Sequence, residues 1–159
     1  MKLITHYLFS IGVMFFSVSL FLNVNPFTLL LVLSVFSVAG NVLIDRLGHE
    51  VRGGYIRRTP RTHTLGRSVF WGILPAIPLI LYAYLFNSYI ALVIFLSCVL
   101  IGPLHIFLDS LTERGIYVRS GGRWRRFSLA SFRYNNPVIN GWFCLIGVLL
   151  LYVSLVKFF

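Results

Sequence analysis

Hydrophobic residues run along this chain in long blocks that contain no charged side chain. Three segments lack Asp, Glu, Lys and Arg altogether: Leu3–Ile44, Ser68–Leu108 and Tyr134–Val156. A helix that crosses about 30 Å of hydrocarbon needs about 20 predominantly apolar residues. The first two segments are therefore long enough for two crossings each, and the third is long enough for one.

Turn-forming residues divide the two longer segments near their middles. Asn23, Asn25 and Pro26 interrupt the first, and Asn87, Ser88 and Tyr89 interrupt the second; clusters of this kind are typical of turns. We predict an all-α membrane protein, one polytopic domain over residues 1–159 with five transmembrane helices and a small cytoplasmic layer of loops and a hairpin. The expected helices are Thr5–Leu22, Phe27–Leu47, Ser68–Phe86, Tyr89–Ser110 and Val138–Phe158, with inner loops over residues 48–67 and 111–137.

The arginines predict the orientation of these helices. With five crossings, the two inner loops and Lys2 share one side of the membrane, and Lys157 lies on the other. Because short loops rich in Arg and Lys stay in the cytoplasm, we expect a multi-pass protein of the cell membrane with a cytoplasmic N-terminus and an extracytoplasmic C-terminus. The arginines of the two loops are Arg46, Arg52, Arg57, Arg58, Arg61 and Arg67, then Arg114, Arg119, Arg123, Arg125, Arg126 and Arg133.

Composition supports this class and restricts the expected partners. The chain is 58% hydrophobic and 11% charged, with a formal net charge of +10, which is outside the usual range of soluble domains. Arginine-rich loops beside a membrane set topology and attract anionic lipid headgroups. The bilayer and anionic headgroups are therefore the expected partners, and nucleic acid is not. Cys98 and Cys144 fall within predicted helices, where they are expected to pack rather than to form a disulfide.

All acidic residues and histidines fall on the predicted inner face. The spacing Asp45-x-x-x-His49 near the end of the second helix repeats in reverse as His105-x-x-x-Asp109 in the fourth. Residues four apart share one helical face, so each helix end offers one nitrogen and one oxygen ligand, a donor set that zinc, manganese or iron accepts. The full set is His6, Asp45, His49, Glu50, His63, His105, Asp109 and Glu113.

Each of these residues also has a purely structural interpretation. Asp45, Glu50 and Glu113 can form interfacial ion pairs with neighbouring arginines, His49 can be solvated, and His6 can anchor the first helix at the membrane surface. His105 and Asp109 are the hardest to explain in this way, because ionisable residues on an otherwise apolar membrane helix are usually functional.

The second inner loop has its own pattern. Ile116–Arg119 and Arg123–Phe127 alternate like two short strands around Gly121-Gly122, which predicts a hairpin. Its arginines and aromatic residues suit the headgroup layer or could hold a phosphate, and a loop that only sets topology is equally consistent with them.

Five segments of the chain carry a family resemblance: Thr5-His6, Asn41–His49, Arg61–Thr64, His105–Gly115 and Arg125–Leu129. They resemble the membrane-bound, metal-dependent hydrolase-like proteins of bacteria and archaea (the YdjM-like group), and within it an archaeal branch of unknown function. Asp45 alone stands where that family carries an acidic pair, which implies a site for one metal instead of two, or for none held tightly.

The resemblance and the residues together lead to a first hypothesis, a metal-dependent hydrolase at the inner membrane surface. Zinc is the expected ion, with manganese or iron as alternatives, and the substrate is expected to be a lipid or phosphate ester. The expected metal ligands are His6, Asp45, His63, His105 and Asp109; the expected catalytic residues are His49, Asp45 and Asp109; and Arg61, Arg114 and Arg126 are expected to bind substrate.

Two other functions stay open from the sequence. A non-catalytic membrane protein could use the same cluster as a structural metal site or as a polar lock between helix ends. A transporter or proton relay is ranked last, because the centres of the predicted helices carry no ionisable residue. Motifs of soluble enzymes such as the P-loop, G-x-S-x-G and G-x-G-x-x-G are absent.

Overall fold

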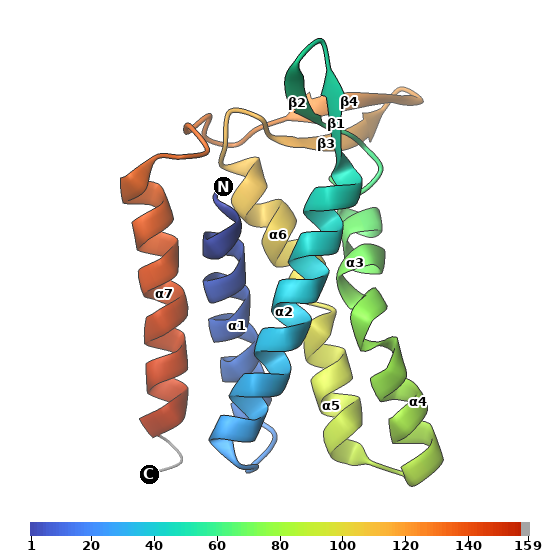
Figure 1. Cartoon of the computed structure of the whole chain (residues 1–159), viewed down its shortest axis with the longest axis vertical. Coiled ribbons are helices and arrows are strands. Elements are labelled where there is room, and N and C mark those ends of the chain that lie inside the picture. The colour runs from blue at the N-terminus through green and yellow to red at the C-terminus, as the bar shows by residue number, and fades with distance from the viewer. Residues whose placement is uncertain (157–159) are drawn as a thin grey trace.

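The computed structural model describes residues 1–156. The helices run side by side, and two hairpins and the N-terminus lie at the same end of the bundle, opposite the end of the last helix (Figure 1). Lys157 and the end of the predicted last helix lie outside the described residues. The elements are α1 Leu3–Ser19, α2 Pro26–Gly48, β1 His49–Arg52, β2 Tyr55–Arg58, α3 Leu65–Ile73, η1 Leu74–Ala76, α4 Ile77–Phe86, α5 Tyr89–Cys98, α6 Ile101–Ser110, β3 Ile116–Ser120, β4 Arg123–Phe127 and α7 Pro137–Val156.

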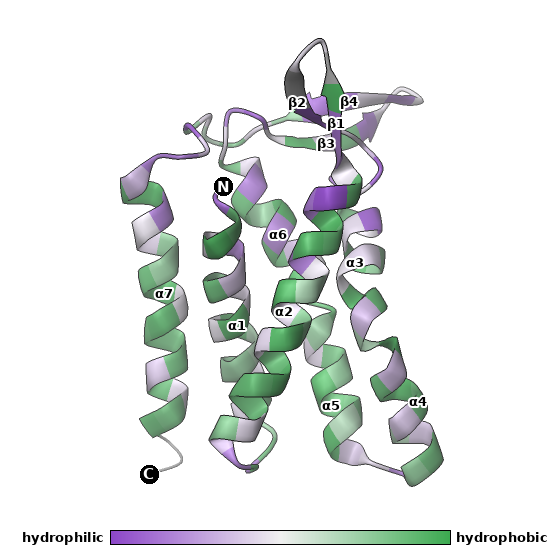
Figure 2. Cartoon of the chain, in the orientation of Figure 1, coloured by the Kyte–Doolittle hydropathy of each residue, from purple (hydrophilic) through white to green (hydrophobic). Residues whose placement is uncertain are grey.

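Four helical segments are long and apolar enough to cross a membrane, which confirms the predicted class of an all-α membrane protein. They are α2, α7, residues 65–86 and residues 89–110. The first helix, α1, is apolar but shorter, and it ends at Ser19 rather than at the predicted Leu22. The prediction of five crossings therefore stays a prediction. Hydrophobic residues dominate the helices, whereas hydrophilic residues gather around the hairpins (Figure 2).

The predicted turns are present, and their side chains show why they form. The Asn25 side chain accepts hydrogen bonds from the amides of Phe27 and Thr28 and so caps α2. Between α4 and α5, Asn87 adopts a left-handed conformation with φ of 49°, which Asn tolerates better than most residues. Ser88 then caps α5 by accepting a hydrogen bond from the Ala91 amide.

Two of the long segments are not continuous α-helices. Residues 65–86 pass through the 3-10 turn η1, which contains Pro75, and Pro78 follows in the first turn of α4. Proline lacks the amide hydrogen that an α-helix needs at an interior position. Residues 89–110 change direction at Val99 and Leu100, between α5 and α6. The predicted boundaries of these segments hold at Phe86, Tyr89 and Ser110, whereas α3 begins three residues before the predicted Ser68.

Glycines let neighbouring helices approach closely around the bundle. A Cβ added to Gly72 of α3 would lie 2.9 Å from the Gly102 nitrogen of α6, and one added to Gly12 of α1 would overlap the Gly147 backbone of α7. Small residues of this kind are typical of helix contacts in membranes. The resulting close packing holds α6 against α3, and α1 against α7, so it fixes the helices that carry the polar cluster described below.

Both connections at the hairpin end contain antiparallel strands. The predicted hairpin is confirmed, because β3 pairs with β4 around Gly121 and Gly122, whose φ values are 58° and 77°. A second hairpin, β1–β2, was not predicted; it turns at Gly53 and Gly54, with φ of 61° and 77°. Two consecutive residues with positive φ match the type I′ turn of tight hairpins, which glycine adopts without strain.

Candidate metal centre

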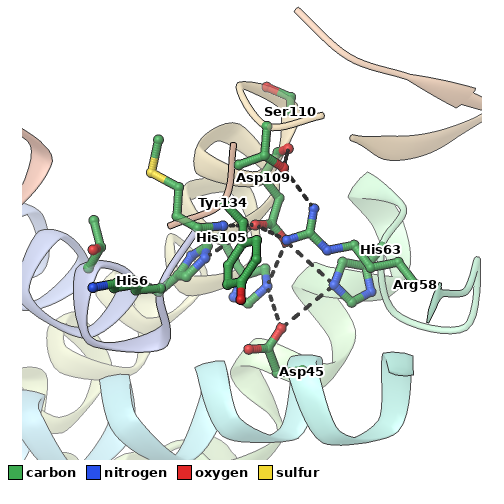
Figure 3. Close-up of polar contacts among 12 residues, drawn as sticks. His6, Asp45, Arg58, His63, His105, Asp109, Ser110 and Tyr134 are labelled. Atoms are coloured by element: carbon green, nitrogen blue, oxygen red, sulfur yellow. Dashed lines mark hydrogen bonds and ion pairs between the residues drawn. The ribbon is translucent and has the colours of Figure 1, made fainter. Parts of the chain in front are cut away.

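Four side chains converge where the helices meet the hairpins. Asp45 lies in the last turn of α2, His63 follows β2, and His105 and Asp109 lie one turn apart on α6 (Figure 3). One ligand atom from each lies within 4.8 Å of the others, and three of the four residues are fully buried. The structure thus brings together four of the five residues predicted to hold a metal, and this quartet could bind one.

The spacing of the donor atoms suits a small divalent ion. His63 Nε2 lies 3.7 Å from Asp45 Oδ1 and 3.4 Å from Asp109 Oδ2, and His105 Nε2 lies 3.5 Å and 3.3 Å from the same two atoms. Ligands about 2.0–2.2 Å from a tetrahedral zinc ion are separated by roughly 3.3–3.6 Å. The four nitrogen-to-oxygen separations lie within about 0.1 Å of that range, and one ligand atom from each of the four residues lies within 4.8 Å of the others, which suits a single small ion.

A hydrogen bond to Thr62 orients the ring of His63. The Thr62 hydroxyl donates to the Ile44 carbonyl oxygen at 2.7 Å, and its oxygen lies 2.9 Å from His63 Nδ1. A hydroxyl has one hydrogen, so the Thr62 oxygen must accept from an Nδ1–H of His63. This arrangement leaves the lone pair on Nε2, the atom that faces both carboxylates.

Asn41 fixes the ring of His105 in the same way. The Asn41 amide nitrogen donates to the Ser37 carbonyl oxygen at 2.9 Å, and its amide oxygen lies 2.8 Å from His105 Nδ1. His105 therefore donates from Nδ1 and keeps the lone pair on Nε2. Metal-binding histidines usually have such a partner on the second ring nitrogen, so both rings are prepared as ligands.

Several buried polar atoms in this region have no hydrogen-bond partner among residues 1–156. They are both ring nitrogens of His6, the Nε2 atoms of His49, His63 and His105, the Nε of Arg58, and Asp109 Oδ2. Buried polar groups are nearly always paired, yet His63 Nε2 and His105 Nε2 each lie within 3.4 Å of Asp109 Oδ2 without a hydrogen bond; a cation between them would satisfy all three. The residues present therefore fit a metal ion.

His6, the fifth predicted ligand, lies beside the quartet. Its ring stacks on His105, with the centroids 4.0 Å apart and the planes 19° apart, and its Nε2 lies 3.3 Å from Asp109 Oδ1. It is buried. His6 thus packs against a ligand and contacts the carboxylate oxygen that faces away from His63 and His105.

Two cationic groups hold that same oxygen of Asp109. The Arg58 Nη2 atom donates to Oδ1 at 2.6 Å, and the Met1 amine donates to it at 2.7 Å. Arg58 also donates to the Thr112 hydroxyl and to the Gly115 carbonyl oxygen. Burial lowers the pKa of the Met1 amine. The sequence did not single out Arg58, because its loop contains six arginines. Only the register of the β1–β2 hairpin distinguishes Arg58 from the other five.

A polar pocket of about 370 Å³ adjoins the quartet. Its lining includes Asp45, His49, Arg58, Arg114 and Tyr134. Asp45 is the one member of the quartet with a partly exposed side chain, at 18%, so the pocket provides access to the donor atoms.

His49 belongs to the wall of this pocket. Its Nε2 lies 3.9 Å from Asp45 Oδ1, and its ring centroid lies 5.2 Å from that of His63. Burial lowers the pKa of His49 to about 4, so its imidazole is neutral at pH 7. A neutral imidazole beside a carboxylate can accept a proton.

The three arginines that were predicted to bind substrate lie in different parts of the structure. Arg114 lines the pocket, and its guanidinium carbon lies 4.8 Å from the centre of the Tyr134 ring. Arg61 instead forms an exposed ion pair with Glu50, with an N···O distance of 3.6 Å, as the structural interpretation of Glu50 anticipated. Arg126 lies on exposed β4, and it is not among the residues that line the pocket. The substrate-binding roles of all three arginines stay predictions.

The packing of this site requires a glycine at the last residue of α2, Gly48. A Cβ at Gly48 would overlap the Thr62 hydroxyl and the Nδ1 and Cε1 atoms of His63. The loop that carries His63 can therefore approach Asp45 only because no side chain stands at Gly48.

Comparison with known proteins identifies a family. Residues 1–108 match the family described as a protein of unknown function, DUF1286. The chain belongs to the DUF1286 family. No curated protein and no solved structure matches the chain.

The matched segment of this DUF1286 protein contains His6, Asp45, His63 and His105, and it ends one residue before Asp109. The family description assigns no activity. The resemblance to the membrane-bound hydrolase-like proteins therefore stays a prediction that rests on the motifs of the sequence.

Proposed function

We propose that this DUF1286 protein is a membrane-embedded, metal-dependent hydrolase that acts at the cytoplasmic membrane surface on a lipid or phosphate-ester substrate. One observation carries the proposal: two imidazole nitrogens and two carboxylates, with nitrogen-to-oxygen separations of 3.3–3.7 Å, adjoin a polar pocket. Catalytic metal sites keep one position open to substrate, and the pocket reaches the quartet at Asp45.

The donor set favours zinc, with manganese or iron as alternatives. Mixed imidazole and carboxylate ligands at these separations are typical of zinc sites. A divalent ion held there would supply Lewis-acid polarisation of the scissile bond and a more acidic water. His63 and His105 would hold the ion through Nε2, because Thr62 and Asn41 each accept a hydrogen bond from the Nδ1 atom of one of these rings.

The residues of this chain would then handle the proton of hydrolysis. Water adds across the ester, so its oxygen bonds to phosphorus or to the acyl carbon, and one of its protons must leave. His49, which is neutral and 3.9 Å from Asp45, accepts that proton and returns it to the departing oxygen. Arg58 neutralises Asp109 on the side away from His63 and His105.

One observation favours a second function, a structural centre without catalysis. Arg58 and the Met1 amine already compensate the charge of Asp109, so the cluster can tie the N-terminal segment, β2 and α6 together as a polar lock. A structural metal in this site would have all its coordination positions filled by protein. The two functions therefore differ in whether an exogenous ligand can reach the ion.

Elemental analysis of detergent-purified protein tests both. We expect about one zinc, manganese or iron ion per wild-type chain, and background levels in His105→Ala and Asp109→Asn. Glu50→Gln is the matched control, because it removes a carboxylate of the same loop layer that lies outside the quartet, and it should retain the metal. Background metal in wild-type protein prepared without chelators would refute the proposal.

A substrate screen on the metal-loaded protein completes the test. We expect turnover of a phosphate-ester or lipid substrate that is lost in His105→Ala and falls strongly in His49→Gln. The His49→Gln variant should keep its metal, which separates proton transfer from ion binding. Bound metal without turnover, together with no binding of small anions to the ion, would support the structural centre instead.

A further inference from the structure

The pocket beside the quartet contains an excess of positive charge. Among its lining residues are three basic side chains, Lys2, Arg58 and Arg114, against a single carboxylate, Asp45. Charge-assisted hydrogen bonds from arginine are strong and match the geometry of phosphate. The same wall includes Leu3, at the start of α1, so the pocket combines an anion-binding lining with an apolar side chain.

The two arginines are held in place before any ligand arrives. The Arg114 guanidinium carbon lies over the Tyr134 ring, 4.8 Å from its centre, a cation–π contact that restricts the position of this side chain. Arg58 is fixed by Asp109, Thr112 and Gly115. The Arg58 side chain is 5% exposed and lines the pocket, so its charge acts on a ligand there while its Nη atoms stay bonded to Asp109, Thr112 and Gly115.

We infer that this pocket is a phosphoryl-binding subsite, in which Arg114 and Arg58 hold the phosphate of a phosphate-ester substrate beside Asp45 and the metal centre. The inference rests on the proposed function and specifies its substrate class. Of the three arginines predicted to bind substrate, the inference keeps Arg114 and omits Arg61 and Arg126, and it adds Arg58. Asp45 would repel a phosphate in the absence of a cation, so phosphate binding requires the metal-loaded protein.

Equilibrium binding of inorganic phosphate to the zinc-loaded, detergent-solubilised chain tests the subsite. Loss of one charge-assisted hydrogen bond to an anion weakens binding roughly ten- to hundredfold, which is the effect expected of Arg114→Gln. Arg125→Gln is the matched control, because it removes the same charge from exposed β4, outside the pocket lining, and it should bind phosphate within about twofold of wild type.

Tyr134 provides a second test that does not depend on removing a charge. Tyr134→Phe keeps the ring beneath Arg114 and should preserve phosphate affinity, whereas Tyr134→Ala removes the ring and should weaken it. Equal phosphate affinity in wild type, Arg114→Gln and Tyr134→Ala would overturn the subsite. The subsite is supported if Tyr134→Ala weakens phosphate binding and Tyr134→Phe does not. Metal content is measured in the same samples, because a misfolded variant would lose its metal as well as its phosphate affinity.

The results separate the subsite from the metal centre. A wild-type chain that holds metal but binds no phosphate overturns the subsite and leaves the metal centre intact. A wild-type chain that holds no metal even when zinc is supplied refutes the proposed hydrolase and overturns the subsite with it, because phosphate binding beside Asp45 requires the cation.

Competition then identifies the source of the phosphoryl group. Bound phosphate is challenged with glycerol 3-phosphate in solution and with phosphatidic acid in a nanodisc. Displacement by the lipid alone supports a subsite for a lipid headgroup, and displacement by the soluble ester supports a subsite for a free phosphate ester. Failure of both to displace phosphate overturns the assignment to phosphate esters.

Discussion

Replacing Asn41 by leucine tests whether His105 is prepared as a metal ligand. The Asn41 oxygen accepts the Nδ1–H of His105 at 2.8 Å, and both side chains are fully buried. Leucine has a similar size and suits the interior of a membrane protein, but it offers no acceptor. The His105 ring would then lose the bond that holds its orientation and keeps the lone pair on Nε2.

The expected cost follows from this single contact. Loss of an outer partner of a metal-binding histidine typically lowers metal affinity about 10- to 100-fold, or about 1.4–2.7 kcal/mol at 1.36 kcal/mol per factor of ten. Truncation of His105 itself removes one of four ligands, so its effect should be larger. Asn41→Leu should therefore still reach one metal per chain at saturation, but with a weaker dissociation constant.

Competition with a chromophoric chelator measures this dissociation constant in detergent. Asn41→Asp serves as the control. It keeps an oxygen acceptor beside His105 Nδ1 but loses the donor to the Ser37 carbonyl oxygen, so its zinc affinity should lie between those of Asn41→Leu and wild type. If Asn41→Leu binds zinc as tightly as wild type while His105→Ala does not bind it, the argument that the Asn41 bond prepares His105 is wrong.

Three further substitutions test other parts of the centre. Gly48→Ala would push the His63 loop away and should lower zinc affinity in the same chelator assay, whereas Gly66→Ala, whose added Cβ meets nothing within 4 Å, should not. His6→Phe keeps an aromatic ring against α6 but removes the nitrogens, so unchanged metal content would exclude His6 as a required ligand. Arg58→Met should destabilise the metal-free protein by up to about 3–5 kcal/mol, because it removes one of the two cationic partners of the buried Asp109 and leaves only the Met1 amine. Added zinc should raise the thermal midpoint of Arg58→Met more than that of wild type, because the ion replaces the positive charge that Asp109 has lost. An equal rise in both proteins would contradict this account.

The helical framework could be predicted because its signals are local. Charge-free segments and the turn residues Asn25 and Asn87 were enough to place most helix ends within a few residues. The end of α1 at Ser19 could not be predicted from local signals. Leu20, Phe21 and Leu22 are as apolar as the helix before them, so the sequence shows no boundary there. The β1–β2 hairpin did have a signal, Gly53-Gly54, the same dipeptide that predicted the second hairpin at Gly121-Gly122.

The site was predictable only in its ligands. The two i,i+4 pairs placed His105 with Asp109 and directed attention to Asp45, and one shared membrane face made their meeting reasonable. The groups that orient them are not local in sequence: Asn41 lies 64 positions from His105, and Arg58 lies 51 positions from Asp109. Such partners depend on how α2, α6 and β2 pack together, which no pattern within one segment encodes.

The first helix has a consequence for how the protein is assembled. The buried face of α1 carries Thr5, His6 and Ser10, and at 17 residues it is near the lower limit for spanning a bilayer. Alone in lipid, α1 would expose these polar groups, and its close partner α7 is synthesised last. We therefore expect α1 to insert stably only when α7 is present. A cysteine placed in the loop after Ser19 should then differ in its labelling by a membrane-impermeant reagent between the chain that includes α7 and the chain truncated before Pro137. Unchanged labelling would show that α1 inserts without α7.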